Sequence, residues 1–268
     1  MRTVFLKLGG SLITDKRTPL TPRPAVIQRL AQECAAGLAQ APDLRLLLGH
    51  GSGSFGHMVA RRYQTRAGVT TAADWRGFAE VSRVAAQLNR LVADAFGAAG
   101  VPVWSLAPSA SALCRDGELL ILADRPVTAA LRQGLTPLVY GDVALDEVRG
   151  GTIVSTEEVF DWLARRLRPD FILLAGMVGG VYNRDPLADA SAQPAPLLSA
   201  ADLAPVADGL GGSHGADVTG GMASKVRAMS SLVQALPGLQ VRFFSGEQPG
   251  AVTRLLLQPE LPIGTLLR

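Results

Sequence analysis

The sequence is poor in cysteine. Cys34 and Cys114 are the only two in 268 residues, they lie far apart, and no CxxC pair occurs. Two isolated cysteines cannot build a disulfide framework or a four-thiolate zinc site. We expect both to be buried, reduced side chains, as in a cytoplasmic protein.

Long apolar runs and dense basic runs are also missing. The chain starts MRTVFLKLGG, which leads directly into a strand-like segment, so we expect neither a signal peptide nor a membrane partner. The net charge is only +3, and basic residues are not interleaved with aromatic ones, so we expect no nucleic-acid partner. The composition, 48% hydrophobic and 18% charged, is that of an ordinary globular protein.

Lysine is the scarcest cation, since arginine supplies all but three of the 26 basic residues. Lysine is a compact point charge that suits phosphoryl oxygens. The three lysines and the three histidines all lie in or beside glycine-containing segments: Lys7, Lys16, Lys225, His50, His57 and His214. A single lysine could fall there by chance, but the six positions together favour a phosphate site.

Apolar segments alternate with helical patterns. Strands are expected at 3–8, 44–48, 101–106, 119–122, 136–140, 171–175 and 240–244. Helices are expected at 24–40, 74–98, 156–167 (with Thr156 as N-cap) and 222–236, and a loop at 186–198. This alternation predicts an α/β domain with a mostly parallel sheet covered on both faces. We expect one domain with lobes at about 1–169 and 170–268.

Four glycine-containing segments could hold phosphate: 7–16, 49–57, 140–158 and 211–225. Such turns follow parallel strands and present backbone N–H groups to anions. The absence of GxxxxGK[ST] excludes a P-loop NTPase. The GxGxxG spacing within 49–57 is weak evidence for a Rossmann turn, because the region where its second strand should end reads as a helix.

The motifs KLGGS, GSGSFGH, PLVYGDV and DVTGGMASK together resemble the amino acid kinase superfamily, and within it the isopentenyl phosphate kinase family. The resemblance spans nearly the whole chain. It implies an open αβα sandwich with a largely parallel central sheet, an N-terminal lobe for the phosphate acceptor, a C-terminal lobe for ATP and Mg²⁺, and a homodimer. The implied reaction is ATP-dependent phosphorylation of isopentenyl phosphate to isopentenyl diphosphate.

The resemblance also implies roles for individual residues. The catalytic residues would be Lys7, Lys16, His57, Glu157 and Lys225. The ATP-binding residues would be Lys7, Gly9, Gly10, Ser11, Gly53, Tyr182, Asp217, Thr219, Gly220, Gly221 and Lys225. The acceptor-binding residues would be Ser52, Gly53, Gly56, His57, Asp142 and Thr156. No protein ligand for a metal is implied, because the ATP phosphates are expected to hold most of the Mg²⁺ coordination.

Phosphoryl transfer requires charge neutralisation more than covalent chemistry. A phosphate acceptor has a second pKa of about 6, so its oxygen is already a nucleophile at neutral pH and needs no general base. His57 is therefore expected to donate a hydrogen bond to the acceptor phosphate, although it could instead cap a backbone group. His50 is expected to brace the turn, and the role of His214 is left open.

For other candidate residues, a structural role is as plausible as a functional one. Asp142 could be a turn or capping aspartate, and Glu157 could complement a helix N-terminus. Glu157 also replaces the aspartate of the SGD motif that relatives tend to carry, since this chain reads Ser-Thr-Glu there. The apolar stripe Phe78, Val81, Ala85 and Leu88 could line a tail pocket, but such stripes more often form core.

Two alternative functions remain. A related kinase, similar to fosfomycin kinase, would act on another phosphate or phosphonate. A non-catalytic nucleotide-binding sensor on the same fold is suggested by the stretch 176–182, which lacks the acidic residues that relatives carry there.

Overall fold

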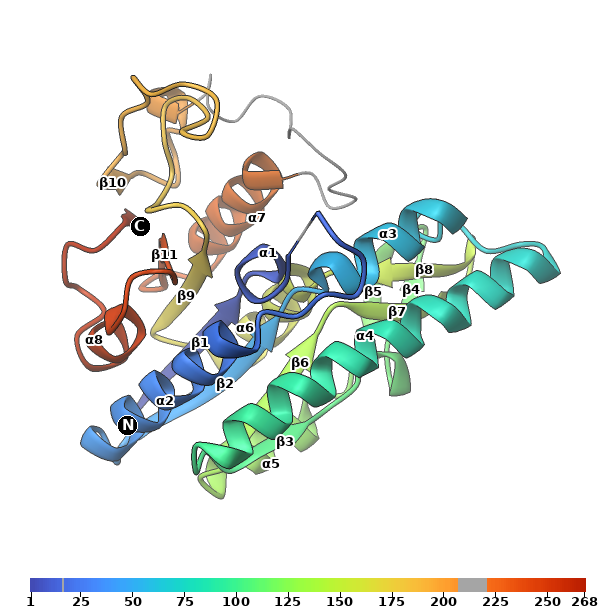
Figure 1. Cartoon of the computed structure of the whole chain (residues 1–268), viewed down its shortest axis with the longest axis horizontal. Helices are drawn as coiled ribbons and strands as arrows, with labels where there is room; N and C mark the ends of the chain where they lie inside the picture. Colours follow the sequence, from blue (N-terminus) through green and yellow to red (C-terminus); the bar gives the residue numbers. More distant parts are fainter. Residues whose placement is uncertain (16, 207–220) are drawn as a thin grey trace.

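A computed structural model describes residues 1–15, 17–206 and 221–268, and it is built around an eight-stranded sheet (Figure 1). In spatial order, the strands are β10 (Leu197–Leu198), β12 (Thr265–Leu267), β11 (Gln240–Ser245), β9 (Phe171–Gly176), β1 (Arg2–Leu8), β2 (Leu44–His50), β6 (Thr136–Tyr140) and β3 (Val103–Ser105). Only the β11–β12 pair is antiparallel among these. The predicted α/β class with a largely parallel sheet is confirmed.

Helices cover both faces of this sheet. On one face lie α2 (Pro24–Gln40), α4 (Ala72–Ala98) and α8 (Ala251–Leu257), and on the other lie α5 (Arg125–Arg132), α6 (Thr156–Leu167) and α7 (Gly221–Ala235). Two further helices, α1 (Gly10–Ile13) and α3 (Gly53–Tyr63), follow β1 and β2, and short 3₁₀ turns lie at Pro108–Ala110 and Ala204–Val206. The structure is therefore an αβα sandwich.

A second, four-stranded sheet has the order β5 (Glu118–Ile121), β4 (Leu113–Arg115), β7 (Asp142–Asp146) and β8 (Gly150–Val154). The segment 140–158 is not a loop as expected, because most of it is the antiparallel β7–β8 hairpin, but residues at both of its ends line the cavity described below. Asp146 holds this sheet together: its carboxylate accepts four backbone N–H groups, from two turns, at 2.7–3.1 Å.

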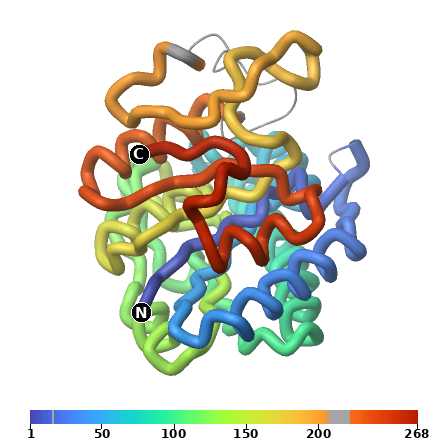
Figure 2. Tube along the Cα trace, turned by 90° about the vertical axis from the view of Figure 1, so that its left-hand side faces the viewer, coloured from blue at the N-terminus to red at the C-terminus, as the bar shows by residue number. Residues whose placement is uncertain are grey.

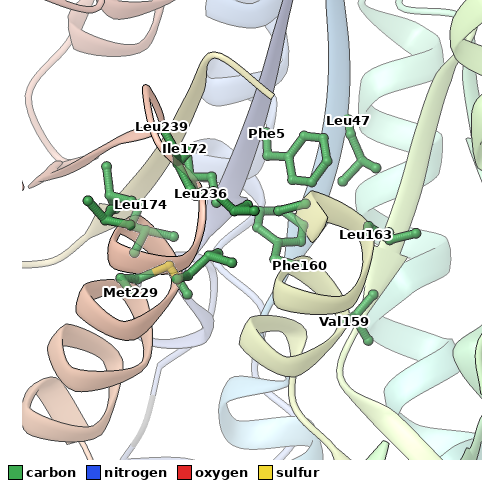
Figure 3. Packing of buried hydrophobic residues seen from close by; sticks show 14 of the residues in the cluster. Phe5, Leu47, Val159, Phe160, Leu163, Ile172, Leu174, Met229, Leu236 and Leu239 are labelled. Atoms are coloured by element: carbon green, nitrogen blue, oxygen red, sulfur yellow. The ribbon is translucent and has the colours of Figure 1, made fainter. Parts of the chain in front are cut away.

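Alternation along β1 decides which side chains meet which helices. Val4, Leu6 and Leu8 pack in the core beside α2 and α8, whereas Phe5 packs on the α6 side. The Phe5 and Phe160 rings meet edge to face with centroids 5.3 Å apart (Figure 3). Because side chains alternate along a strand, Lys7 lies on the same face as Phe5. That alternation directs Lys7 toward α6.

The predicted helices at 24–40, 74–98, 156–167 and 222–236 are confirmed as α2, α4, α6 and α7, with small shifts at their ends. The N-cap of α6 is Ser155 rather than Thr156, because Ser155 accepts the Glu158 N–H in a capping box. The segment GSGSFGH was predicted as a loop, but Gly53 onward forms α3. Glycine and serine are poor helix formers, and packing of Phe55 and Ala60 in the core outweighs that preference.

Most of 186–198 is irregular, as predicted, and its end forms β10, which pairs with β12. Figure 2 shows this segment, in yellow and orange, at the same end of the molecule as the C-terminus. Cys34 and Cys114 are buried free thiols, as expected. Among the residues that the structure describes, no helix is both long enough and apolar enough to cross a membrane.

The turns after β1 and β2 touch each other through their backbones. A Cβ on Gly10 would clash with the backbone N and Cα of Gly53, and Gly53 itself has φ +49°. Thr14 ties the two turns together, since its Oγ1 donates to the Gly10 carbonyl at 2.7 Å and accepts the Ser54 N–H at 2.9 Å. These glycines allow the turns after β1 and β2 to lie side by side.

We therefore predict that Gly10→Ala lowers the free energy of unfolding by ~1–3 kcal/mol, because the methyl group would overpack rigid backbone. The control is Gly97→Ala in α4, where a Cβ would meet nothing within 4 Å. That change should raise stability by up to ~1 kcal/mol through helix propensity. Urea unfolding of both variants measures the difference, and equal stability of the two would show that the turns do not need this close approach.

Candidate active site

One cavity lies where the carboxyl ends of β1 and β2 meet the N-termini of α3 and α6. Its empty volume is about 740 Å³, part of it open to solvent. Its lining residues are Lys7, Gly10, Ser11, Gly51, Ser52, Gly56, His57, Ala60, Arg66, Val81, Ala85, Gly141, Asp142, Ile153, Ser155, Thr156, Glu157 and Lys225. Segments far apart in the sequence therefore meet at the edge where ligands bind in such sheets.

Most of the predicted site residues lie in this cavity. Gly9 and Gly53 belong to the same turns but do not line it, and Tyr182 pairs with Pro194 in an isolated bridge elsewhere. Gly221 begins α7. Lys16, His214, Asp217, Thr219 and Gly220 lie outside the described residues, so their roles stay predictions.

Lys7 and Glu157 form the most buried ion pair across the cavity. The Lys7 ammonium donates to Glu157 Oε1, and the two side chains are 7% and 11% exposed. Burial would raise the pKa of Glu157, but attraction to Lys7 and then to Lys225 outweighs it and holds the pKa below its usual value. Glu157 is therefore a carboxylate at neutral pH, and it offsets two ammonium groups in one place.

His57 lies in the first turns of α3 rather than in a loop. It is half-buried and lines the cavity beside Ser52 and Gly56. Ser52 and Gly56 are in close contact, because a Cβ on Gly56 would clash with the Ser52 side chain. The partial positive charge of the α3 N-terminus adds to this end of the cavity. His57 thus lies on the cavity wall, and its role as a donor to an anion stays a prediction.

His50 is fully buried and braces the turn after β2, as predicted. Its Nδ1 lies 3.1 Å from the Gly51 carbonyl, and its Nε2 lies 3.1 Å from Nδ2 of Asn89, whose Oδ1 accepts from Ser105. Because Asn89 donates, Nε2 accepts and Nδ1 carries the proton. Burial lowers the His50 pKa to about 4, with a smaller contribution from Lys7, so the ring stays neutral. It also stacks on Tyr140 at 5.4 Å.

Asp142 lines the cavity and also accepts backbone N–H groups, and an active-site role for it stays a prediction. It begins β7 and lines the cavity, while its carboxylate accepts the N–H of Val143 at 2.8 Å and that of Ser109 at 3.4 Å. Burial raises its pKa above the usual range, although these hydrogen bonds oppose the shift. The Thr156 hydroxyl also makes a hydrogen bond within the protein, because it donates to the His50 carbonyl at 2.7 Å.

Part of the cavity lining is apolar. Ala60, Val81, Ala85 and Ile153 line it. Of the apolar stripe on α4, Val81 and Ala85 face the cavity, whereas Phe78 packs against neighbouring side chains and Leu88 is plain core. Helical spacing had indicated Val81 and Ala85. No local signal pointed to Ala60 or Ile153, because only the packing of α3 and β8 brings them here.

Comparisons with known proteins agree with this geometry. The amino acid kinase family model matches residues 2–245. Isopentenyl phosphate kinase of Haloferax volcanii is 38% identical over 265 residues, covering 95% of this chain and 99% of the relative. That of Methanothermobacter thermautotrophicus is 32% identical over 264 residues, covering 96% of both.

Solved structures give the same result. A structure described as "X-ray structures of isopentenyl phosphate kinase" covers both chains completely, with TM-score 0.83 and 28% identity. A UMP kinase from Bacillus anthracis, with TM-score 0.65 and 16% identity, shares the fold alone. The chain therefore belongs to the amino acid kinase family and, within it, to the isopentenyl phosphate kinases.

Proposed function

We infer that this chain transfers a phosphoryl group from ATP to isopentenyl phosphate, giving isopentenyl diphosphate for isoprenoid biosynthesis. The observation that carries this proposal is the polarity of one cavity. Lys7, Lys225 and His57 line it together with the glycine turns, and Val81 and Ala85 give it an apolar wall on α4. A small phosphate monoester with a short apolar tail matches both features.

The chemistry follows from charge. The acceptor oxygen is anionic above pH ~6, so it can attack the transferred phosphoryl group directly, and the proton-transfer step that an alcohol would need is absent. In our proposal His57 holds the acceptor phosphate, while Lys7 and Lys225 neutralise charge on the transferred oxygens. Glu157 orients the two lysines through its ion pair with Lys7.

We propose that ATP lies beside the turn Gly9–Gly10–Ser11, with Tyr182, Gly221 and Lys225 from the C-terminal half. The Gly9 N–H donates to the Ala175 carbonyl at 2.8 Å, so this turn is fixed to the end of β9. The acceptor would then lie in a lobe of about 1–169 and the nucleotide in one of about 170–268. Two buried free thiols favour a reducing, cytoplasmic location.

Mg²⁺ would enter with the nucleotide. Within the described ranges, no group of three His, Cys, Asp or Glu side chains could hold a metal ion. The cavity carboxylates are also engaged, since Glu157 pairs with Lys7 and Asp142 accepts backbone N–H groups. Mg²⁺ is commonly held by substrate phosphates, where it neutralises their charge, so the ATP phosphates would supply most of its ligands.

A homodimer also belongs to this proposal. β3 is the last strand of the large sheet, and its outer edge is unpaired within the described part of the chain. Exposed apolar side chains lie on adjoining segments: Leu91 on α4, Trp104 on β3 and Leu135 before β6, which are 40%, 44% and 37% exposed. A second copy pairing along β3 would extend the sheet and cover this edge.

Two other functions compete with this one. A kinase similar to fosfomycin kinase would use the same phosphate-binding end with a different tail. A nucleotide-binding sensor would bind ATP without turnover.

We predict that a panel assay of ADP release separates these functions. Isopentenyl phosphate should give kcat/KM at least ~10-fold above that of fosfomycin or UMP, because the cavity discriminates by its apolar contacts. Dimethylallyl phosphate and an amino acid complete the panel. Preference for fosfomycin would favour the related kinase, and ATP binding without turnover of any acceptor would favour the sensor.

For the homodimer, light scattering should give twice the 28.1 kDa of the chain. Trp104→Lys should shift the protein toward monomer, because it places a charge on the pairing edge. Ile121→Lys is the matched control, since Ile121 is 54% exposed on the edge strand of the other sheet. A monomeric wild type, or equal loss of dimer in both variants, would contradict this interface.

The fourth prediction concerns His57. His57→Ala should lower kcat/KM for isopentenyl phosphate by ~10- to 200-fold, the effect of losing a charge-assisted hydrogen bond of ~1.5–3 kcal/mol. KM for ATP should change little. His57→Gln keeps an N–H donor and should recover part of the loss, which replacement of a general base would not do.

Steady-state kinetics with each substrate varied in turn provide the measurement. The control is Met58→Ala, because Met58 is the next residue in α3, is 43% exposed and does not line the cavity. If His57→Ala damaged ATP and acceptor parameters equally, or if Gln were no better than Ala, His57 would be bracing the structure.

A further inference from the structure

An arginine lines the apolar part of the cavity. Arg66 follows the end of α3, and its guanidinium makes a two-pronged ion pair with Glu158. Nη1 donates to Oε2 at 2.8 Å and Nη2 donates to Oε1 at 2.6 Å, while Nη1 also donates to the Ile153 carbonyl. The Glu158 pairing raises the pKa of Arg66, which stays charged. A short apolar acceptor tail offers no hydrogen-bond acceptor or negative charge to a guanidinium.

The pair is held from both sides. Glu158 is the third residue of α6, and its Oε2 also accepts the Ser155 N–H at 2.6 Å in the capping box. The Arg66 carbonyl accepts from Thr152 Oγ1 at 3.1 Å and from Arg149 at 3.4 Å. Arg66 is thus fixed to β8 through its backbone and to α6 through its side chain.

Arg66 and His57 come from opposite ends of α3. Along α3, His57 comes first, Ala60 follows about one turn later, and Arg66 comes after the helix has ended at Tyr63. α4 runs in the opposite direction, since Asn89 contacts His50 whereas Gly77 packs against Tyr63. The apolar lining of α3, α4 and β8 therefore lies between His57 and Arg66.

We propose that the Arg66–Glu158 ion pair forms the end wall of the tail cavity and restricts the acceptor to a short tail, an inference that rests on the proposed function. The two side chains are 34% and 31% exposed, so water still solvates part of both. A longer apolar tail would have to press against the pair and remove that water, and it could offer no hydrogen bond in return. A five-carbon tail ends before it makes this contact.

The test compares a five-carbon with a ten-carbon acceptor, isopentenyl phosphate and geranyl phosphate, in the full-length enzyme. Arg66→Met removes the charge but keeps an unbranched side chain, and Glu158→Gln breaks the pair while keeping an amide oxygen for the Ser155 N–H. We expect each variant to raise the ratio of kcat/KM for geranyl phosphate over isopentenyl phosphate by at least ~10-fold. Arg165→Met is the matched control, because Arg165 pairs with Asp161 on the exposed face of α6, away from the cavity.

The outcomes are distinct. An unchanged ratio in both variants, with thermal melts showing that they fold, would overturn the proposal. A wild-type enzyme that already uses both acceptors equally would overturn it as well. A variant that loses turnover of isopentenyl phosphate without gaining geranyl phosphate would show that Arg66 supports the site rather than limiting tail length. Wild type inactive on both acceptors would instead refute the proposed function.

Discussion

The site depends on a single buried carboxylate, Glu157. Lys7 and Lys225 both line one cavity, where their like charges repel each other unless a carboxylate lies between them. Glu157 stays ionised there because the attraction of both lysines outweighs the cost of its own burial. The folded protein thus keeps a concentrated positive charge in place before any substrate arrives, which is the preorganisation that phosphoryl transfer requires.

The geometry of the sheet fixes where these charged side chains lie. Alternation along β1 directs Phe5 into the core beneath α6 and Lys7 to the same face near the start of that helix. The turns after β1 and β2 approach each other closely because glycines meet there without side chains. Apolar packing on both faces of the sheet therefore fixes the spacing of the polar site.

Much of this could be predicted from the sequence, and the failures have physical reasons. Apolar strands and amphipathic helices carry their periodicity locally, so α2, α4, α6 and β9 were found within a few residues. The start of α3 was missed because its glycines and serines oppose helix formation, and only tertiary packing makes it helical. The β7–β8 hairpin was missed because its glycine pair, Gly150 and Gly151, reads as a loop in the sequence. In the structure Gly150 has φ +75° at the start of β8. Arg66 carries no motif, and only the return of the chain after α3 brings it to the cavity.

The first turn of α6 connects these features. In a helix, consecutive side chains point about 100° apart, so neighbouring residues can serve different neighbours. Ser155 caps the helix, Thr156 donates to the carbonyl of His50, Glu157 neutralises the lysines, and Glu158 pairs with the arginine beside the apolar end. A shift of α6 by one residue would break all four contacts at once. The charged end, the brace behind it and the wall of the tail cavity are consequently held in one fixed relation by a single helix N-terminus.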